Sequence, residues 1–288
     1  MLNRLILLIA ISAVLACSDQ KNSDPPFSRA ESLGILTNDA INEASGLEAS
    51  IKNPGLLWTH NDSGDTARIF LIHENGQDVK TFYLSGLQNR DWEDLTLGPG
   101  PEKGENYLYI AEMGDNKAIH EYQYIYRFKE PSRDDDVMIT DVDVIRFQYP
   151  DGNRDAECLM VDPLTADLYI VSKREQNVHL YNMAYPQSTS ETVIPKNVGT
   201  LHFHKIVAGD ISADGQEIIM KTYDRILYWK RKENNDIKET LLTPPIDVPY
   251  QPEPQGESIA WNVDDSGFYT LSEEPGEKEA EVYFYQRK

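Results

Sequence analysis

Short runs of aromatic and β-branched residues recur along most of the chain, separated by turn residues such as Ala213-Asp214-Gly215 and Asp265-Ser266-Gly267. Runs of this kind, bounded by Gly, Asp, Asn or Pro, are typical of β-strands. No stretch of residues 27–288 has the sustained helical periodicity of an amphipathic helix. The pattern therefore predicts an all-β protein.

One short pattern, an oxygen-bearing residue directly before or near a Leu or Ile, opens five successive groups of strands. The five copies lie at intervals of roughly 50 residues, the period of β-propeller blades with several short strands each. They are Ala44–Leu47, Trp92–Leu95, Ala156–Leu159, Gly209–Ile211 and Gly256–Ile259.

Two further strand-like runs follow each opening pattern, and four groups have a fourth run. The fifth group ends at Lys288 without room for a fourth strand, and Ser32–Thr37, which precedes the first group, is left without a blade. The sequence therefore predicts a five-bladed β-propeller closed by an N-terminal strand that completes the last blade. The predicted fourth strands are Val79–Leu84, Val142–Tyr149, Thr192–Val198 and Lys238–Leu242.

The first residues indicate export. Arg4 precedes an apolar run, Leu5–Ala16, that is too short to span a bilayer as a helix. The segment Val14–Cys17 resembles the lipobox of bacterial lipoproteins, which implies cleavage before Cys17 and acylation of that residue. The alternative is an ordinary secretory signal with an incidental cysteine.

This reading divides the chain into three parts. We expect a lipoprotein signal peptide at 1–16, a flexible polar tether at 17–26 and one propeller domain at 27–288. The protein would then be a monomer held on a membrane of the cell envelope by the lipid at Cys17.

Charge and cysteine content narrow the possible partners. The formal net charge of −21 disfavours binding to nucleic acid or to anionic lipid headgroups. Cys158 is the one cysteine besides Cys17, and its apolar neighbours predict a buried structural thiol rather than a nucleophile.

The opening pattern places an oxygen-bearing side chain at the start of each first strand, the strand that lines the channel of a propeller. Several carboxylates on one narrow axis repel one another unless a cation lies among them. A set of oxygen ligands without Cys or His disfavours zinc and favours calcium (Ca²⁺) over magnesium. The alternative is that these acids only bond backbone amides of the next blade. The predicted ligands are Ser45, Glu93, Glu157, Asp210 and Glu257.

A second series of polar residues follows the second strands and is expected to frame one mouth of the channel. We predict that basic side chains there bind an anionic group, and that nearby acids orient or deprotonate water. Salt bridges between blades are the alternative. The basic residues are Arg90, Lys173, Arg174 and Lys221, and the acids are Asp62, Asp94 and Glu112.

Four of the opening motifs resemble the channel motifs of calcium-activated nucleotidases (apyrases), namely Ser45–Leu47, Glu93–Leu95, Glu157–Leu159 and Glu257–Ile259. That resemblance implies five blades and one central calcium, but Asp210 stands where the family has Ser, and the fuller catalytic set of the family is not recognisable. The chain is also similar to SdiA-regulated propellers and to secreted bacterial five-bladed propellers without an assigned activity.

Three functions fit these observations. The first is a calcium-dependent hydrolase of phosphoester or phosphoanhydride bonds. The second is a non-catalytic surface module that binds protein, peptide or glycan and uses the metal structurally. The third is a glycan hydrolase that uses central carboxylates.

Overall fold

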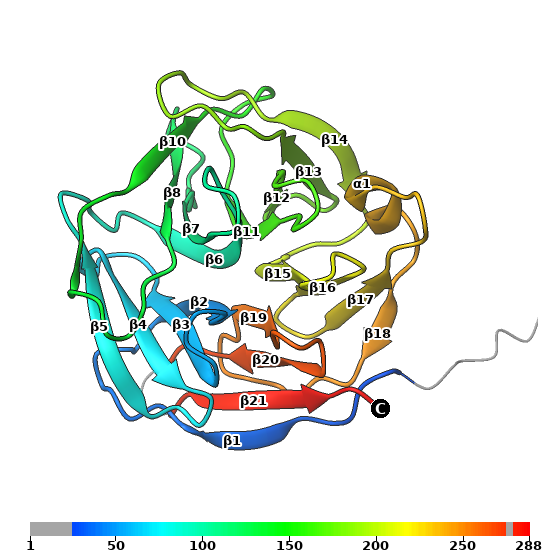
Figure 1. Cartoon of the computed structure of the whole chain (residues 1–288). Coiled ribbons are helices and arrows are strands. Elements are labelled where there is room, and N and C mark those ends of the chain that lie inside the picture. The colour runs from blue at the N-terminus through cyan, green and yellow to red at the C-terminus, as the bar shows by residue number, and fades with distance from the viewer. Residues whose placement is uncertain (1–24, 275–278) are drawn as a thin grey trace, which may run out of the picture.

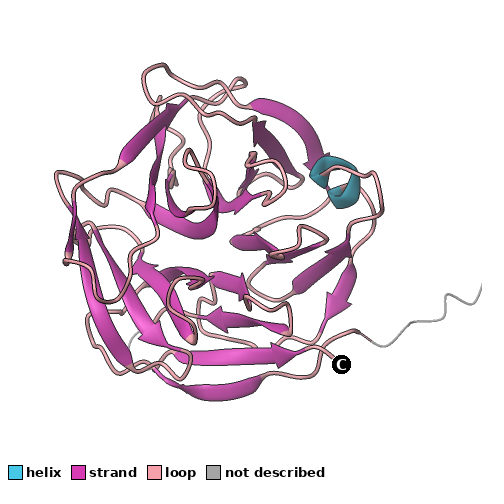
Figure 2. Cartoon of the chain, in the orientation of Figure 1, coloured by secondary structure: helices cyan, strands magenta, loops and turns pink. Residues whose placement is uncertain are grey.

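The structure, a computed structural model, describes residues 25–274 and 279–288. Over these residues the chain forms five β-sheets arranged as blades around a common centre, and one short helix (Figure 1). Figure 2 shows how completely strands and loops dominate the molecule. The prediction of a five-bladed β-propeller is confirmed.

The first three blades follow the chain outward from the centre. Blade 1 contains β2 (Ala44–Ala49), β3 (Leu56–Asn61), β4 (Arg68–His73) and β5 (Asp78–Leu84). Blade 2 contains β6 (Trp92–Pro99), β7 (Asn106–Glu112), β8 (Gln123–Lys129) and β10 (Asp143–Phe147). Blade 3 contains β11 (Ala156–Val161), β12 (Leu168–Ser172), β13 (Val178–Met183) and β14 (Lys196–Leu201).

The last two blades complete the ring. Blade 4 contains β15 (Ala208–Ile211), β16 (Glu217–Lys221), β17 (Ile226–Lys230) and β18 (Ile246–Val248). Blade 5 contains β19 (Ser258–Trp261), β20 (Gly267–Leu271), β21 (Glu281–Gln286) and, outermost, β1 (Glu31–Ile35). The first strands contact one another in a closed circle, β2 with β6, β6 with β11, β11 with β15, β15 with β19 and β19 with β2.

The N-terminal strand closes the ring, as predicted. β1 runs antiparallel to β21, with Glu31 opposite Phe284, so the last blade joins the two ends of the described chain. Just before β1, the fully buried ring of Phe27 packs edge-on against Tyr228 of blade 4 and Phe268 of blade 5. This segment therefore joins two blades as well as covering the edge of β21.

Apolar side chains form five buried clusters, one between each pair of neighbouring blades of the described chain. Between blades 1 and 2, Trp58 and Phe82 lie 5.5 Å apart between ring centroids, and Trp92 lies in the same cluster. Burying one such side chain stabilises the fold by about 1.5–3 kcal/mol. The cores between blades hold the first strands, and hence the channel, in place.

One predicted strand is wrong. Lys238–Leu242 was expected as the outer strand of blade 4, but α1 (Ile237–Leu241) lies there and β18 takes the outer position. The Asp236 side chain accepts a hydrogen bond from the backbone N–H of Glu239, while the Glu239 side chain accepts one from the N–H of Asp236. This capping box stabilises a helical turn, and burial of Ile237 and Leu241 fixes it on the blade.

Blade 1 gains a fifth strand from an unexpected source. After β8, the chain leaves blade 2 and forms β9 (Met138–Ile139), which pairs in parallel with β5. On the way, the buried Glu130 carboxylate accepts hydrogen bonds from Ser50 Oγ (2.6 Å) and Trp58 Nε1 (3.1 Å). The crossing segment therefore fastens blade 2 to blade 1.

Of the two cysteines, Cys158 lies in the described part of the chain and Cys17 does not. Cys158 is fully buried, in agreement with a structural thiol, and burial raises the pKa of that thiol well above its usual value. Cys17 and the predicted signal peptide lie outside the described residues. In the part of the chain that the structure describes, no helix has the length and apolar character needed to cross a membrane.

Candidate functional site

Bulges near the start of the first strands place acids at one end of the ring that these strands form, here called the channel mouth. The pairing of first and second strands shifts register at Ser45, Glu93 and Glu157, in blades 1, 2 and 3 respectively. Such a bulge leaves the extra residue out of the ladder and redirects its side chain. Glu257 lies directly before β19, so it too lies outside the regular pairing.

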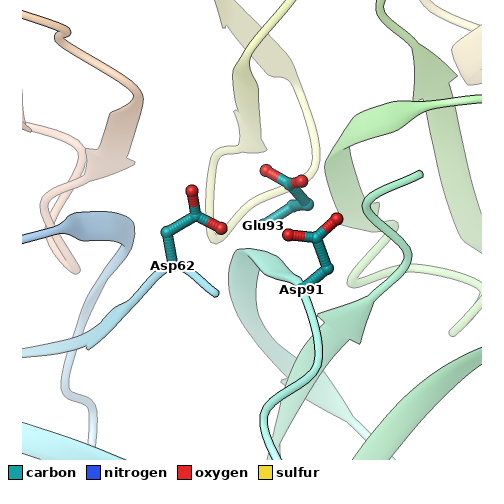
Figure 3. A group of neighbouring side chains, drawn as sticks. All are labelled: Asp62, Asp91 and Glu93. Atoms are coloured by element: carbon teal, nitrogen blue, oxygen red, sulfur yellow. The ribbon is translucent and has the colours of Figure 1, made fainter. Parts of the chain in front are cut away.

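Three acids that lie at or near these bulges converge. Asp62 follows β3, whereas Asp91 and Glu93 lie at the start of β6, and their carboxylates point toward one another (Figure 3). One oxygen from each lies within 4.8 Å of the others. Asp62 and Asp91 are partly exposed and Glu93 is buried, so the group opens toward solvent on one side.

Two members of this group lack partners. Among residues 25–274 and 279–288, the side chains of Asp91 and Glu93 accept no hydrogen bond and form no ion pair by the usual distance criteria. Gly114 makes room for them, because a Cβ at that position would overlap both carboxylates. The two acids are therefore held beside each other by the backbone rather than by a protein donor.

Two further groups of acids adjoin the first and share its members. Asp62, Glu257 and Glu273 form one, and Glu93, Asp155 and Glu157 form the other, again with oxygens within 4.8 Å. Acids from blades 1, 2, 3 and 5 therefore meet at one mouth of the channel.

This crowding changes the acidity of the group. Burial first, and then the charges of Glu157 and Asp62, raise the pKa of Glu93 well above its usual value. Burial, with the charges of Asp91 and Glu257, raises the pKa of Asp62 to about 7. Ionising the whole set is costly without a counter-ion, and a divalent cation would supply one.

The four predicted anion-binding residues all have acidic partners. Lys173 pairs with Glu157 and lies 3.7 Å from Glu257, while Arg174 pairs with Asp155 at 2.5 Å. Arg90 lies 3.2 Å from Glu112.

Lys221 is the most enclosed of these bases. Its fully buried ammonium donates to Tyr250 Oη and to the carbonyl of Gly256, both at 2.7 Å, and pairs with Glu253 at 3.1 Å. Burial lowers its pKa. Two of its donors are used in hydrogen bonds and its charge is paired with Glu253, so Lys221 is held inside the protein rather than offered to a ligand.

Three predicted site residues connect backbone segments. Asp94 accepts from the N–H of Leu159 in blade 3 (2.8 Å), and Asp210 accepts from the N–H of Trp261 in blade 5 (2.7 Å). Ser45 Oγ donates to the carbonyl of Glu93 at 2.6 Å. Asp94, Asp210 and Ser45 belong to none of the three acidic groups found among the described residues.

Glu112 holds the backbone of the segment that carries Asp91. Its two oxygens accept hydrogen bonds from the backbone N–H groups of Arg90 and Asp91, both at 2.9 Å. These bonds fix the loop that carries Asp91. Of the three acids predicted to act on water, Asp62 alone belongs to the acidic groups.

A small pocket borders the acids on the side of blades 3 and 4. It has a volume of about 280 Å³ and is lined by Lys173, Arg174, His204, Lys205 and Tyr223. The Tyr223 hydroxyl donates a hydrogen bond to Glu257 and Lys173 pairs with Glu157, so two lining residues contact the acidic groups. In the described chain, the Lys205 side chain has no hydrogen bond or ion pair by the usual distance criteria.

The sequence analysis did not single out Asp91, Asp155 and Glu273, which belong to the acidic groups. A signal was present for two of them, since Asp91 and Asp155 each lie two residues before a predicted ligand, in the shared pattern Asp-X-Glu. Glu273 lies two residues after the end of β20, and Asp62 lies one residue after the end of β3.

Comparison with known proteins adds little to the site. No protein-family model and no curated protein match the chain. Among solved structures, it is similar to one titled "Crystal structure of Nidogen/Laminin Complex", at 9% sequence identity over 81% of this chain and 73% of that chain, with a TM-score of 0.47.

Proposed function

We propose that the channel mouth binds calcium and that the propeller uses this site to bind a ligand at the cell envelope. The observation that carries the proposal is the convergence of Asp62, Asp91 and Glu93, two of which have no partner in the described chain. Keeping unpaired carboxylates side by side is costly, and a bound cation removes that cost.

The donor set favours calcium. Calcium takes 6–8 oxygen ligands and tolerates irregular geometry, whereas magnesium needs a compact octahedron. Three carboxylates with monodentate or bidentate contacts, completed by water on the open side, meet that requirement. No Cys or His belongs to the group, which disfavours zinc.

Thermal unfolding of the purified protein tests the proposal. Calcium at a hundredfold excess over its dissociation constant should stabilise the fold by about 2.7 kcal/mol, and a chelator should reverse this. Asp91→Asn should abolish most of the shift, because it removes a ligand charge without breaking a hydrogen bond of its side chain. Asp134→Asn, at an exposed site distant in sequence, is the matched control. Equal melting temperatures with calcium and with chelator would contradict the proposal.

A second candidate, the calcium-dependent hydrolase of phosphoesters or phosphoanhydrides, is favoured by the basic pocket beside the acids. There, Lys173, Arg174 and the unpaired Lys205 surround a space next to the cation position. A metal and nearby cationic side chains stabilise charge that develops on phosphoryl oxygens. Asp62 is then the residue that orients water.

A substrate screen separates the two functions. Nucleoside di- and triphosphates, sugar phosphates and aryl glycosides would be assayed with calcium and with chelator. The hydrolase predicts calcium-dependent turnover of a phosphate substrate that Lys205→Ala reduces. Turnover that persists in chelator contradicts it, and an absence of turnover on every class leaves the binding module.

The cellular location remains tied to Cys17. The proposed lipid anchor predicts that the mature chain begins at an acylated Cys17, as mass analysis of the N-terminus would show, and that Cys17→Ala releases the protein from membranes. An unmodified N-terminus elsewhere would contradict the anchor.

A further inference from the structure

We propose that the channel mouth binds a second divalent cation, held by Glu93, Asp155 and Glu157, with Glu93 bridging the two positions. The inference rests on the first calcium site, since the two sites share Glu93. It makes the mouth a paired-cation centre.

The geometry of the shared residue supports this. Glu93 belongs both to the group with Asp62 and Asp91 and to the group with Asp155 and Glu157. Its two carboxylate oxygens can serve one cation each, and paired cations in proteins lie about 3.5–4 Å apart. All three residues of the second group are buried, with exposures of 3% or 4%.

One buried atom of the second group lacks a hydrogen-bond partner in the described chain. Glu157 Oε2 is shielded from solvent and has no hydrogen-bond partner among the described residues, while Oε1 pairs with Lys173. An unpartnered buried carboxylate oxygen is costly, so a partner that the protein itself does not provide is expected there.

The basic neighbours set the order of binding. Lys173 already supplies positive charge to Glu157, and Arg174 does so for Asp155. The second cation must therefore compete with the Lys173 ammonium for Glu157. The second site therefore binds calcium more weakly than the first.

Two neighbouring cations would restrict the chemical class of the ligand. They clamp a group with two anionic oxygens, such as a phosphate or a carboxylate, and they can stabilise both the attacking and the leaving oxygen in a displacement. The proposed site therefore requires an anionic group in its ligand.

Calorimetric titration of calcium into the purified protein tests the inference. The unmodified protein and Asp134→Asn should each bind two calcium ions, one tightly and one weakly. Glu157→Gln should keep the tight site and lose the weak one. Lys173→Met should tighten the weak site by about tenfold, the equivalent of about 1.4 kcal/mol, because the competing ammonium is gone.

The other outcomes distinguish this inference from the proposed function. A single calcium that Asp91→Asn removes, but that Glu157→Gln and Lys173→Met leave unchanged, overturns the second site and keeps the first. No bound calcium in any variant overturns both. Two calcium ions retained in Glu157→Gln would place the second cation elsewhere and overturn the bridge.

Discussion

At the scale of single residues, the same acidic repeat has two roles, and the local backbone decides between them. Glu93 and Glu157 lie on bulges and face the channel mouth. Asp210 lies within regular pairing, opposite Ile219, and accepts the N–H of Trp261 in the next blade. In these three residues, the acids on bulges face other acids, and the acid within regular pairing links two blades.

Because Asp210 is buried, we expect it to make the free energy of unfolding depend on pH. Burial raises the pKa of Asp210 from 3.8 to about 7. The folded state therefore keeps a proton that the unfolded chain has lost, so this group lowers the free energy of unfolding as pH rises from about 4 to about 7. Asp210→Asn carries no charge at any pH and keeps one acceptor oxygen. Its stability should consequently fall less between pH 5 and pH 8.

Urea unfolding in chelator at both pH values measures this difference, with Asp134→Asn as the control. The same decrease in Asp210→Asn and in the unmodified protein would show that Asp210 is ionised in the folded state throughout that range.

The site was only partly predictable from its residues. The acids Glu93, Glu157 and Glu257 were visible as a repeat, because blades recur at a fixed period. Bulges depend on how two strands pair, and the repeat did not reveal that Asp210 would be left out. Asp91 could have been found from the Asp-X-Glu pattern that it shares with Asp155.

At the scale of elements, the closing strand was predictable because the last blade lacked one strand and the chain offered one spare run. The helix α1 was not predictable, because the apolar residues of a segment as short as IKETL are compatible with a strand or a helix. The capping box at Asp236 selects the helix. β9 was not predictable either, because a strand of two residues that joins another blade is too short to show a periodic pattern in the sequence.

The closing strand approaches blade 1 so closely that glycine is required. Gly34 of β1 has φ +149°, and a Cβ there would overlap the carbonyl oxygen of Asn75 in the turn after β4. Gly55 also has positive φ, at +79°, but a Cβ there would meet open space. Ala at Gly55 should cost about 1 kcal/mol of backbone strain. Ala at Gly34 should cost a further 1–3 kcal/mol or so from overlap.

Urea unfolding of Gly34→Ala and Gly55→Ala compares the two costs directly. Equal losses would mean that β1 can move away from blade 1 without penalty, and that ring closure depends on the pairing with β21 alone.

At the scale of the whole molecule, the propeller collects at one mouth acids that lie more than a hundred residues apart in sequence. Asp62 and Glu273 come from blades 1 and 5, yet their oxygens lie within 4.8 Å because the ring closes between those blades. The protein carries a net charge of −21, so its field attracts cations in general. The fold, the concentration of acid and the basic pocket beside it together favour a metal-assisted site for an anionic ligand.

Anomalous X-ray scattering from crystals grown with calcium would locate the proposed cation. We expect an anomalous peak about 2.3–2.6 Å from carboxylate oxygens of Asp62, Asp91 and Glu93. The same peak should vanish in crystals of Asp91→Asn. A map without a peak at this mouth, in crystals of folded protein grown in excess calcium, would contradict the proposed site.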